Sequence, residues 1–330
     1  MIADHPEPSP NTEVKHTRNG GRRPQILVTG AGGALAQRAI QRLKHHYDII
    51  ALDFRHKPEI EACTDSYCVQ FHKREFEDIF RSHNIEGVLH LGRITAFQES
   101  RSSRYNANVI GTKKLLDLCA KYDVRAVQIL STYHVYGAHP YNPALIEEEA
   151  PLKAAELTMD LVDSVELENL AAIYLWKYPS LNVCVLRPCN IIGPGINNTM
   201  ARLLSRHYAP WVVGFSPMMQ FLHADDMADA IAAAFHHHRR GVFNVAPEDW
   251  VAYTKALDEC GCRKVPIPPV PDTVPKFISN LLGWRSFPRY LVNYFKYPVV
   301  IDGSLFRKTF GFKPQYGPRE LFAYYREMKN

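Results

Sequence analysis

The stretch that decides the fold is Ile26-Leu27-Val28-Thr29-Gly30-Ala31-Gly32-Gly33. Its first half is apolar and β-branched, which predicts a buried strand. Its second half is rich in glycine, which predicts a tight turn, and a helical pattern begins at Leu35. The stretch therefore predicts a strand that turns through glycines directly into a helix.

The spacing of the small residues gives this turn a binding role. Gly30, Gly33 and Ala36 form the pattern G-x-x-G-x-x-A, in which the first glycine allows the turn and the second lets the backbone approach a pyrophosphate. The alanine is small enough for the helix to pack closely on the sheet, and the helix N-terminus attracts the negative phosphates. We expect this corner to bind a dinucleotide. Its predicted contacts are Gly30, Gly32, Gly33, Ala34 and Leu35.

Asp53 ends the second predicted strand and selects the cofactor. A carboxylate there accepts hydrogen bonds from the hydroxyl groups of the adenosine ribose and repels a 2′-phosphate, so the sequence favours NAD over NADP. Arg55 lies close by and keeps NADP open. We count Asp53, Phe54 and Arg55 among the expected cofactor contacts.

Strand and helix patterns alternate from Gln25 onward, which predicts a Rossmann-type α/β fold with a doubly wound parallel sheet. The expected strands are Gln25–Thr29, Asp48–Asp53, Cys68–Phe71, Gly87–Leu91, Ala126–Ser131 and Asn182–Arg187. The expected helices are Leu35–His46, Phe76–His83, Tyr105–Tyr122 and Leu161–Tyr178. Strands such as the fifth are apolar throughout, as expected where helices cover both faces of the sheet.

The pattern loosens after residue 190, where proline and glycine become frequent. We expect a disordered leader over residues 1–24, an NAD-binding domain over 25–190 and a smaller C-terminal substrate lobe over 191–330. A helix at Asp225–His238 followed by a strand at Gly241–Val245 suggests that one strand returns from this lobe to the sheet. The stretch Val265–Val300 is rich in proline and aromatic residues.

Composition narrows the class of protein. The 330 residues are 46% hydrophobic and 22% charged, and the net charge of +5 is spread too thinly for a nucleic-acid-binding surface. No run of 18 apolar residues indicates a transmembrane segment. Seven cysteines, none in a C-x-x-C pair, and the lack of an apolar signal-peptide core predict a reducing, cytoplasmic location.

Six motifs, in order along the chain, resemble the extended short-chain dehydrogenase/reductase superfamily, and within it the NAD-dependent epimerase/dehydratase family. The resemblance spans about residues 24–327. Its motifs are Val28-Thr29-Gly30, Val88-Leu89-His90-Leu91-Gly92, Asn108-Val109-Ile110-Gly111-Thr112, Ser131-Thr132-Tyr133-His134-Val135-Tyr136-Gly137, Leu186-Arg187-Pro188-Cys189-Asn190-Ile191-Ile192-Gly193-Pro194-Gly195 and Phe221-Leu222-His223-Ala224-Asp225-Asp226-Met227-Ala228.

The resemblance implies a function and a set of site residues. It implies an enzyme that acts on a nucleotide sugar by transient hydride transfer to NAD, with Thr132 holding the reacting oxygen. It adds Leu91, Gly92, Arg93, Asn108, Pro188 and Ile191 to the expected cofactor contacts. It places Thr132, Tyr133, His134 and Asn190 at the substrate, and a helical homodimer is common in the family.

The catalytic pattern is broken at the helix after the fifth strand. The family places a Tyr and a Lys there, four residues apart, and alignment on Glu168 puts Leu161 and Val165 at these positions. Neither side chain can move a proton, as in a divergent group of UDP-glucose 4-epimerase-like proteins that lack the pair. The one Y-x-x-x-K in the chain, from Tyr325 to Lys329, lies at the C-terminal end, and we interpret it as the end of a surface helix.

Three functions therefore stay open. A histidine side chain ordinarily titrates near neutral pH, so His134, like Asp160 and Asp163, could replace the missing base. An active epimerase or dehydratase is the leading interpretation, and a non-catalytic NAD-binding sensor or scaffold is the alternative. The C-terminal aromatic residues, Phe277–Tyr297, raise a lipid or hydroxysteroid dehydrogenase as a third.

The adjacent histidines at positions 236–238 are not expected to form a metal site. Consecutive residues of a helix point in different directions and cannot share one ion.

Overall fold

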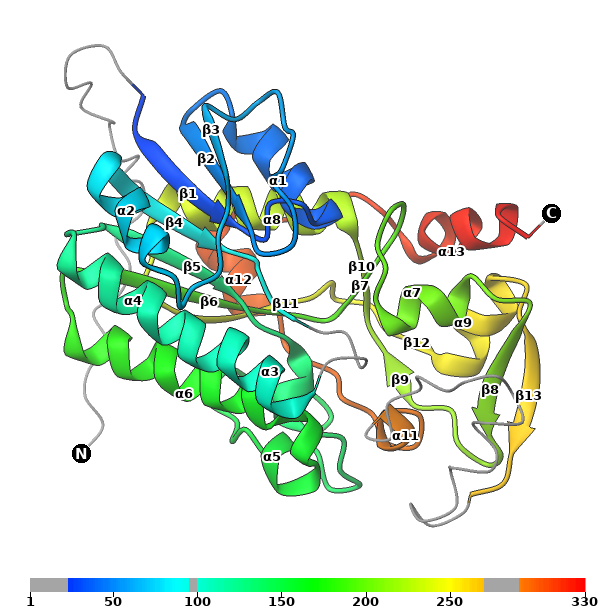
Figure 1. The fold of residues 1–330 in the computed structure, drawn as a ribbon. Helices are drawn as coiled ribbons and strands as arrows, with labels where there is room; N and C mark the ends of the chain where they lie inside the picture. The colour runs from blue at the N-terminus through cyan, green and yellow to red at the C-terminus, as the bar shows by residue number, and fades with distance from the viewer. Residues whose placement is uncertain (1–22, 95–99, 270–290, 330) are drawn as a thin grey trace.

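The computed structural model describes residues 23–94, 100–269 and 291–329, and a seven-stranded parallel sheet forms its centre (Figure 1). The strands are β1 (Gln25–Thr29), β2 (Asp48–Asp53), β3 (Asp65–Cys68), β4 (Ile85–His90), β5 (Ala126–Leu130), β6 (Asn182–Pro188) and β11 (Gly241–Val245). Their spatial order is β11-β6-β5-β4-β1-β2-β3. The predicted Rossmann-type α/β fold is confirmed. Since the order reverses between β1 and β4, the carboxyl ends of these two strands define the switch point where such folds bind ligands.

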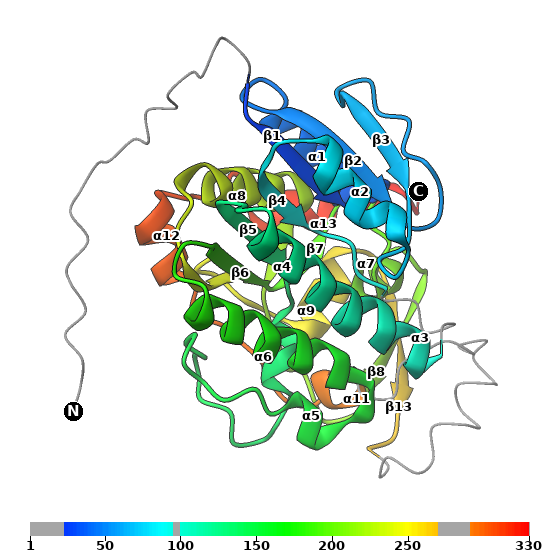
Figure 2. The ribbon, with the colours of Figure 1, turned by 60° about the vertical axis from the view of Figure 1, so that its left-hand side comes forward.

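Helices cover both faces of the sheet, as Figures 1 and 2 show. One face is covered by α1 (Ala34–Leu43) and α8 (Ala224–His237), and the other by α2 (Arg74–Ser82), α4 (Gly111–Lys121) and α6 (Val162–Lys177). Neighbouring residues of β1 enter different cores: Val28 packs in the same cluster as Ala36, whereas Leu27 packs with Leu115. Burial on both faces explains why these strands are apolar throughout.

The last strand of the sheet comes from the C-terminal half of the chain. Strand β11 pairs in parallel with β6, so that Gly241 lies opposite Cys184 and Val245 opposite Pro188. Around it lie three strand pairs: β7 (Asn190–Ile192) with β10 (Phe221–His223), β8 (Tyr208–Val212) with β13 (Arg263–Ile267), and β9 (Met218–Met219) with β12 (Val251–Ala252). Besides α8, the described residues of this half form the helices α7 (Thr199–Leu204), α9 (Tyr253–Glu259), α11 (Leu291–Tyr294), α12 (Ser304–Phe310) and α13 (Pro318–Glu327).

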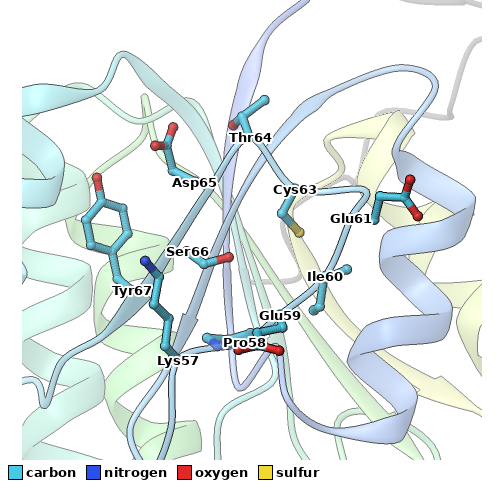
Figure 3. Close-up of a pocket in the computed structure, with 10 residues that line it drawn as sticks. All are labelled: Lys57, Pro58, Glu59, Ile60, Glu61, Cys63, Thr64, Asp65, Ser66 and Tyr67. Carbon is cyan, nitrogen blue, oxygen red and sulfur yellow. The ribbon is translucent and has the colours of Figure 1, made fainter.

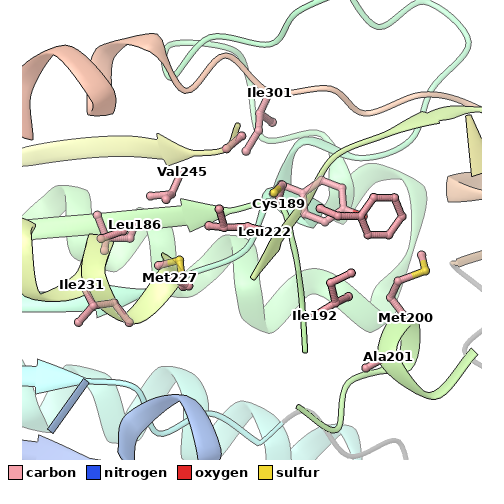
Figure 4. Packing of buried hydrophobic residues seen from close by; sticks show 14 of the residues in the cluster. Leu186, Cys189, Ile192, Met200, Ala201, Leu222, Met227, Ile231, Val245 and Ile301 are labelled. Carbon is pink, nitrogen blue, oxygen red and sulfur yellow. The ribbon is translucent and has the colours of Figure 1, made fainter. Parts of the chain in front are cut away.

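One apolar cluster joins this half to the sheet. Leu186 of β6 and Val245 of β11 pack in the same cluster as Leu222 of β10, Met227 of α8 and Ile301 (Figure 4). All five side chains are almost fully buried. The C-terminal half is therefore held on the sheet by continuous packing.

The third strand was predicted too late in the chain. Its apolar residues, Val69 and Phe71, suggested a strand over Cys68–Phe71, but β3 is Asp65–Cys68 and pairs with β2 from Ile50 onward. Phe71 instead leaves the strand and packs on Phe76, with ring centroids 4.9 Å apart. An edge strand needs few buried side chains, which is why its polar sequence was overlooked.

The helix predicted over Tyr105–Tyr122 is wrong as one regular helix. The chain forms α3 (Arg101–Tyr105), then a π-helical turn η1 (Asn106–Ile110), then α4. A π-turn inserts one extra residue into the helix and is frequent at functional sites. It turns Asn108 inward, where the side chain is 1% exposed.

Two searches cover the described ranges only. No helix within them has the length and hydropathy needed to cross a membrane. Nor do these residues hold a group of three His, Cys, Asp or Glu side chains placed to bind one metal ion. The His236 ring stacks on Tyr47, and the His237 ring packs at a tilt against Phe310, so the two rings have separate partners.

Candidate cofactor and substrate site

The backbone brings β1 and β4 together at the switch point. Gly30 has a φ of +69°, and a Cβ atom at this position would lie 2.5 Å from the Cα of Gly92. Any side chain at residue 30 would therefore collide with the backbone that follows β4. The turn is closed by a 3.0 Å hydrogen bond from the Gly33 N–H to the Gly30 carbonyl. Glycine is required here by both conformation and space.

The N-terminus of α1 is free of competing anions. Its N-cap, Gly33, offers no side-chain cap, and the first turn contains no acidic residue. Ala34 and Leu35 are the first residues of this turn. The first N–H groups of a helix have no partner within it and carry the positive end of the helix dipole. The corner thus fits the pyrophosphate of a dinucleotide.

Asp53 is fixed by backbone groups on both sides. Its carboxylate accepts hydrogen bonds from the N–H of Gly32 at 3.1 Å and from the N–H of Arg55 at 3.1 Å. Each carboxylate oxygen can accept a second bond, so the group retains capacity for ribose hydroxyls. The Phe54 ring packs on Phe71 at 4.4 Å, and the side chain of Arg55 is exposed. These residues fit the adenosine half of the cofactor.

Two expected cofactor residues make contacts with the protein itself. Arg93 Nη2 donates a 2.6 Å hydrogen bond to Ser164 Oγ on α6. Asn108 bonds the backbone of Ile94 through both ends of its amide and donates to Asp163 Oδ2 at 2.6 Å. Leu91 and Gly92 continue from β4 at the predicted edge. The sequence had no signal for the partners on α6, because they lie far along the chain.

Thr132 caps a short 3-10 helix, η2 (Tyr133–Tyr136), just beyond β5. Its hydroxyl oxygen lies 2.8 Å from His134 Nδ1 and also accepts a bond from the His134 N–H. Burial lowers the pKa of His134 to about 3, and the positive charge of Arg93 adds to this effect. At neutral pH the imidazole is therefore uncharged.

Tyr133 and Asn190 are bonded to each other. The Tyr133 hydroxyl donates to Asn190 Oδ1 at 3.0 Å, and Asn190 Nδ2 donates to the Gln220 carbonyl at 3.0 Å. Asn190 is 7% exposed and lies in β7, next to Ile191 and just after Pro188, the last residue of β6. Hydrogen bonds therefore fix both side chains where the substrate is expected to bind.

The two positions where the family places its Tyr and Lys hold apolar side chains in apolar surroundings. Leu161 and Val165 are buried in the same cluster that joins the two halves of the chain. Of the acids beside them, Asp160 pairs with Arg101 at 3.4 Å, and Asp163 accepts the bond from Asn108. Both acids are engaged in structural contacts.

A buried ion pair that the sequence analysis missed supports this region. Glu168 of α6 accepts two bonds from Arg187 of β6, both at 3.0 Å, and one from the Ser131 hydroxyl. Arg187 also donates to the Tyr136 hydroxyl at 2.8 Å. In the sequence, Glu168 served only to align the helix with the family. A glutamate on the buried face of a helix nevertheless indicates a cationic partner, because charged side chains are rarely buried unless they are paired.

The C-terminal Tyr325 and Lys329 do not form a site, but Tyr325 is not a surface residue as predicted. It is 1% exposed, and its hydroxyl accepts a 2.9 Å bond from the Gly193 N–H. Lys329 donates to the Cys260 carbonyl at 2.6 Å. Apolar residues on the inner face of α13 explain the burial.

Comparison with known proteins decides the family. The sequence model of the NAD dependent epimerase/dehydratase family matches residues 26–246, more than half of the chain. The chain belongs to this family. The NAD prediction is confirmed with it, because the family is NAD-dependent, and the resemblance stated from the motifs is confirmed as well.

Individual relatives are distant. An uncharacterized protein of Mycobacterium tuberculosis is 25% identical over 91% of this chain and 82% of its own length. The UDP-glucose 4-epimerase of Dictyostelium discoideum is 28% identical over 51% of this chain and 52% of its own. Among solved structures, MoeE5 in complex with UDP-glucose and NAD has a TM-score of 0.72 at 20% identity and covers 92% of this chain and 98% of its own. This last likeness supports the fold.

A separate surface pocket lies away from this edge. It is lined by residues of β3, including Tyr67, and of the segment that connects β2 to β3, including Lys57, Glu59 and Cys63 (Figure 3). None of the predicted site residues is among its lining residues. The pocket is therefore not part of the candidate site.

Proposed function

We propose that the protein is an NAD-dependent epimerase or dehydratase that acts on a nucleotide sugar. Family membership supports the reaction class. The observation that carries the proposal is the position of the Thr132–His134 pair, which lies just beyond β5 at the same sheet edge as the Gly30 turn. The cofactor of this family supplies reversible hydride acceptance at its nicotinamide ring.

The chain's own residues divide the work. The N-terminus of α1 would hold the pyrophosphate, and Asp53 the adenosine ribose, for the reasons given by their geometry. Thr132 would hold the reacting hydroxyl of the sugar. The buried bonds among Tyr133, Asn190 and Gln220 would keep the substrate surface rigid.

A panel assay tests this proposal. Purified protein is incubated with NAD and UDP- and dTDP-sugars, and products are separated by liquid chromatography with mass detection. We expect an epimer or a dehydrated sugar, with turnover reduced about 100-fold or more by Thr132→Ala. Ser102→Ala, an exposed hydroxyl deletion on α3, is the matched control and should leave turnover unchanged. Silence across the panel contradicts the proposal.

Burial of Leu161 and Val165 specifically favours a second candidate, a non-catalytic NAD-binding protein. It predicts that NAD raises the melting temperature by mass action without any turnover. Cofactor reduction that disappears in Thr132→Ala would exclude it.

The lipid or hydroxysteroid interpretation receives no support from the described aromatic residues. Residues 277–290 of the aromatic stretch lie outside the residues that the structure describes. Tyr294 is buried and donates from its hydroxyl to the His134 carbonyl, and the Phe295 ring packs on Tyr253 at 4.7 Å. These rings complete the core beside the site.

We further propose a homodimer formed through α4 and α6. Ile173 and Trp176 of α6 are 56% and 80% exposed, and Ile110, just before α4, is 51% exposed. Lys113 and Glu166 flank them with opposite charges, as a self-complementary interface requires. Light scattering should report a dimer, and the double variant Ile173→Glu with Trp176→Glu should be a monomer.

We also propose a cytoplasmic location. All seven cysteines are unpaired, which supports it because the cytoplasm is a reducing compartment.

A further inference from the structure

Two basic side chains, at and just beyond the end of α13, hold the turn that joins α9 to β13; α13 packs beside α9 (Figure 1). Arg326 Nη2 donates to the Asp258 carbonyl at 3.3 Å. Lys329 Nζ donates to the Cys260 carbonyl at 2.6 Å and to Cys262 Sγ at 3.0 Å. The Lys329 nitrogen is therefore held in direct contact with the Cys262 sulfur, although the two residues lie far apart in the chain.

The sulfur of Cys262 is held in place as well. The N–H of Cys262 donates to the Leu257 carbonyl at 2.8 Å, and its thiol donates to the Leu204 carbonyl at 3.6 Å. Cys262 is 6% exposed, whereas Lys329 is only half-buried. The contact lies at the border of the C-terminal half, within reach of a molecule as small as a peroxide but not of a bulky thiol such as glutathione.

This contact distinguishes Cys262 from the other cysteines. Of the hydrogen bonds that the described residues make to a cysteine sulfur, the bond from Lys329 is the one with a cationic donor. Burial raises the pKa of the neighbouring Cys260 thiol to about 12, which keeps that thiol protonated and unreactive. Cys68 is exposed at the end of β3 and provides a reference thiol at the surface. Cys262 is thus the cysteine that has an amine as its immediate neighbour.

The Cys262–Lys329 contact provides the groups for a two-step oxidation by a peroxide. The reaction starts from the thiolate, the nucleophilic form of cysteine, whose negative charge an ammonium ion stabilises. The Cys262 sulfur attacks one peroxide oxygen: a sulfur–oxygen bond forms, the oxygen–oxygen bond breaks, and the leaving hydroxide takes a proton from the Lys329 ammonium and departs as water. The sulfur is oxidised to a sulfenic acid, and the peroxide is reduced.

The second step uses the amine that the first step leaves behind. The neutral Lys329 nitrogen attacks the sulfenic sulfur, so a sulfur–nitrogen bond forms and the sulfur–oxygen bond breaks. Hydroxide leaves with a proton from the nitrogen as a second water, and no further oxidant is needed. The flexible stem of the lysine allows the short movement that closes the bond. Burial of the sulfur favours this neighbouring amine over a thiol from solution.

We propose that Cys262 and Lys329 form a peroxide-sensitive modification site, at which a reversible sulfur–nitrogen bond fastens the segment after α13 to the turn between α9 and β13. The inference does not depend on the proposed function. Helix α13 also carries Tyr325, whose hydroxyl accepts the bond from the Gly193 N–H just after β7. The new bond would therefore fasten the helix that supports the loop next to Asn190.

Mass spectrometry of the full chain tests the bond directly. The protein is treated with hydrogen peroxide, the excess is removed with catalase, and free thiols are blocked before proteolysis. We expect the peptides that carry Cys262 and Lys329 to be joined with the loss of two hydrogen atoms, and to separate after treatment with dithiothreitol.

Two lysine variants provide the comparison. Lys329→Arg keeps the positive charge but removes the primary amine, so the joined peptides should disappear and dimedone should trap Cys262 as a sulfenic acid. Lys264→Arg is the matched control, because Lys264 lies two residues from Cys262 and bonds Asp258 at 2.8 Å instead of the sulfur. It should form the joined peptides as the wild type does.

The wild-type experiment alone can overturn the inference, so its outcome does not depend on the folding of a variant. Oxidation of the exposed Cys68 while Cys262 remains a free thiol contradicts it. A disulfide between Cys260 and Cys262, found within one peptide in place of the joined pair, contradicts it as well. So does a joined pair that persists in Lys329→Arg.

The melting temperature tests whether the bond fastens the helix. A covalent link between residues far apart in the chain reduces the entropy of the unfolded state. We expect the Tm of the peroxide-treated wild type to rise by about 5 °C and to return after dithiothreitol. Lys329→Arg should show no such rise. An unchanged Tm in protein that carries the bond would contradict the fastening of α13.

Discussion

The two sides of one sheet edge are built in different ways. On the cofactor side, the Gly30 turn, the N-terminus of α1 and Asp53 come from a short continuous segment and use backbone groups. On the proposed proton-transfer side, Arg93 lies in the loop after β4, Thr132 caps a 3-10 helix and Ser164 lies on α6, so the three residues are far apart in the chain. The cofactor side keeps the glycine spacing that the resemblance rests on, whereas on the other side Leu161 and Val165 stand where the resemblance places a Tyr and a Lys.

This difference shows which changes each side can tolerate. A backbone-built site depends on conformation and space, so a single methyl group at a glycine can destroy it. A side-chain-built site can exchange one residue for another, provided that a charge or a hydrogen bond arrives from a neighbouring element. Substitutions on the two sides should therefore fail for different physical reasons.

The largest expected effect is on the support of the proton-transfer side. Glu168→Ala leaves the buried Arg187 without its carboxylate and should lower the free energy of unfolding by about 3–5 kcal/mol. Urea denaturation followed by circular dichroism measures this. Asn169→Ala, at an exposed position of the same helix, should change it by less than about 0.5 kcal/mol. A loss of less than about 1 kcal/mol in Glu168→Ala would show that the fold around Thr132 does not depend on the Glu168–Arg187 ion pair.

The cofactor side should fail through its backbone. Gly30→Ala places a methyl group against Gly92 and should weaken NAD binding about 100-fold, or about 3 kcal/mol, in calorimetric titration. Gly214 also has a positive φ, of +85°, but nothing lies within 4 Å of its added Cβ. Gly214→Ala should therefore cost only the backbone strain, about 1–2 kcal/mol of stability, and leave NAD affinity intact. Equal NAD affinities in the two variants would refute the close-approach argument.

Replacing the Asp53 side chain on the cofactor side should have a smaller effect on NAD affinity. Asp53→Asn removes the charge and half of the acceptor capacity, so NAD affinity should fall about tenfold. NADP affinity should fall less or rise, because the repulsion of a 2′-phosphate is relieved. The same titrations on Asp48→Asn, at the other end of β2, provide the control. A parallel loss for both cofactors would contradict the proposed ribose contact.

The smallest effect concerns pH. Burial lowers the pKa of His90 to about 3, while its ring bridges Thr29 at 2.7 Å and Thr112 at 2.9 Å. Between about pH 6.5 and 3 the unfolded chain binds a proton that the folded chain excludes, so stability is complete above this window and falls as the pH decreases through it. Urea midpoints measured from pH 7.5 to 4.5 should decline less steeply in His90→Asn. The exposed His45→Asn should retain the wild-type slope.

Much of the fold was predictable because its signals are local. Gly30, Gly33 and Asp53 act through turn geometry and strand ends, which one short segment encodes. The polar edge strand Asp65–Cys68 and the π-turn at Asn106–Ile110 were missed, since the first carries no apolar pattern and the second is set by contacts of Asn108 with Ile94 and Asp163. No local pattern distinguishes such a turn from a regular helix.

The sequence by itself determined the sheet and the dinucleotide corner, because each depends on residue type at a fixed spacing, and its resemblance to the family places Leu161 and Val165 where a Tyr and a Lys are expected. Only the tertiary structure decided what stands beside the vacated positions. Arg93 and Ser164 meet there, and the Thr132–His134 pair follows β5 at the same sheet edge, because parallel strands bring their carboxyl ends to one edge, however far apart they lie in the chain. Spatial proximity of this kind is a property of the packed sheet and cannot be read from spacing.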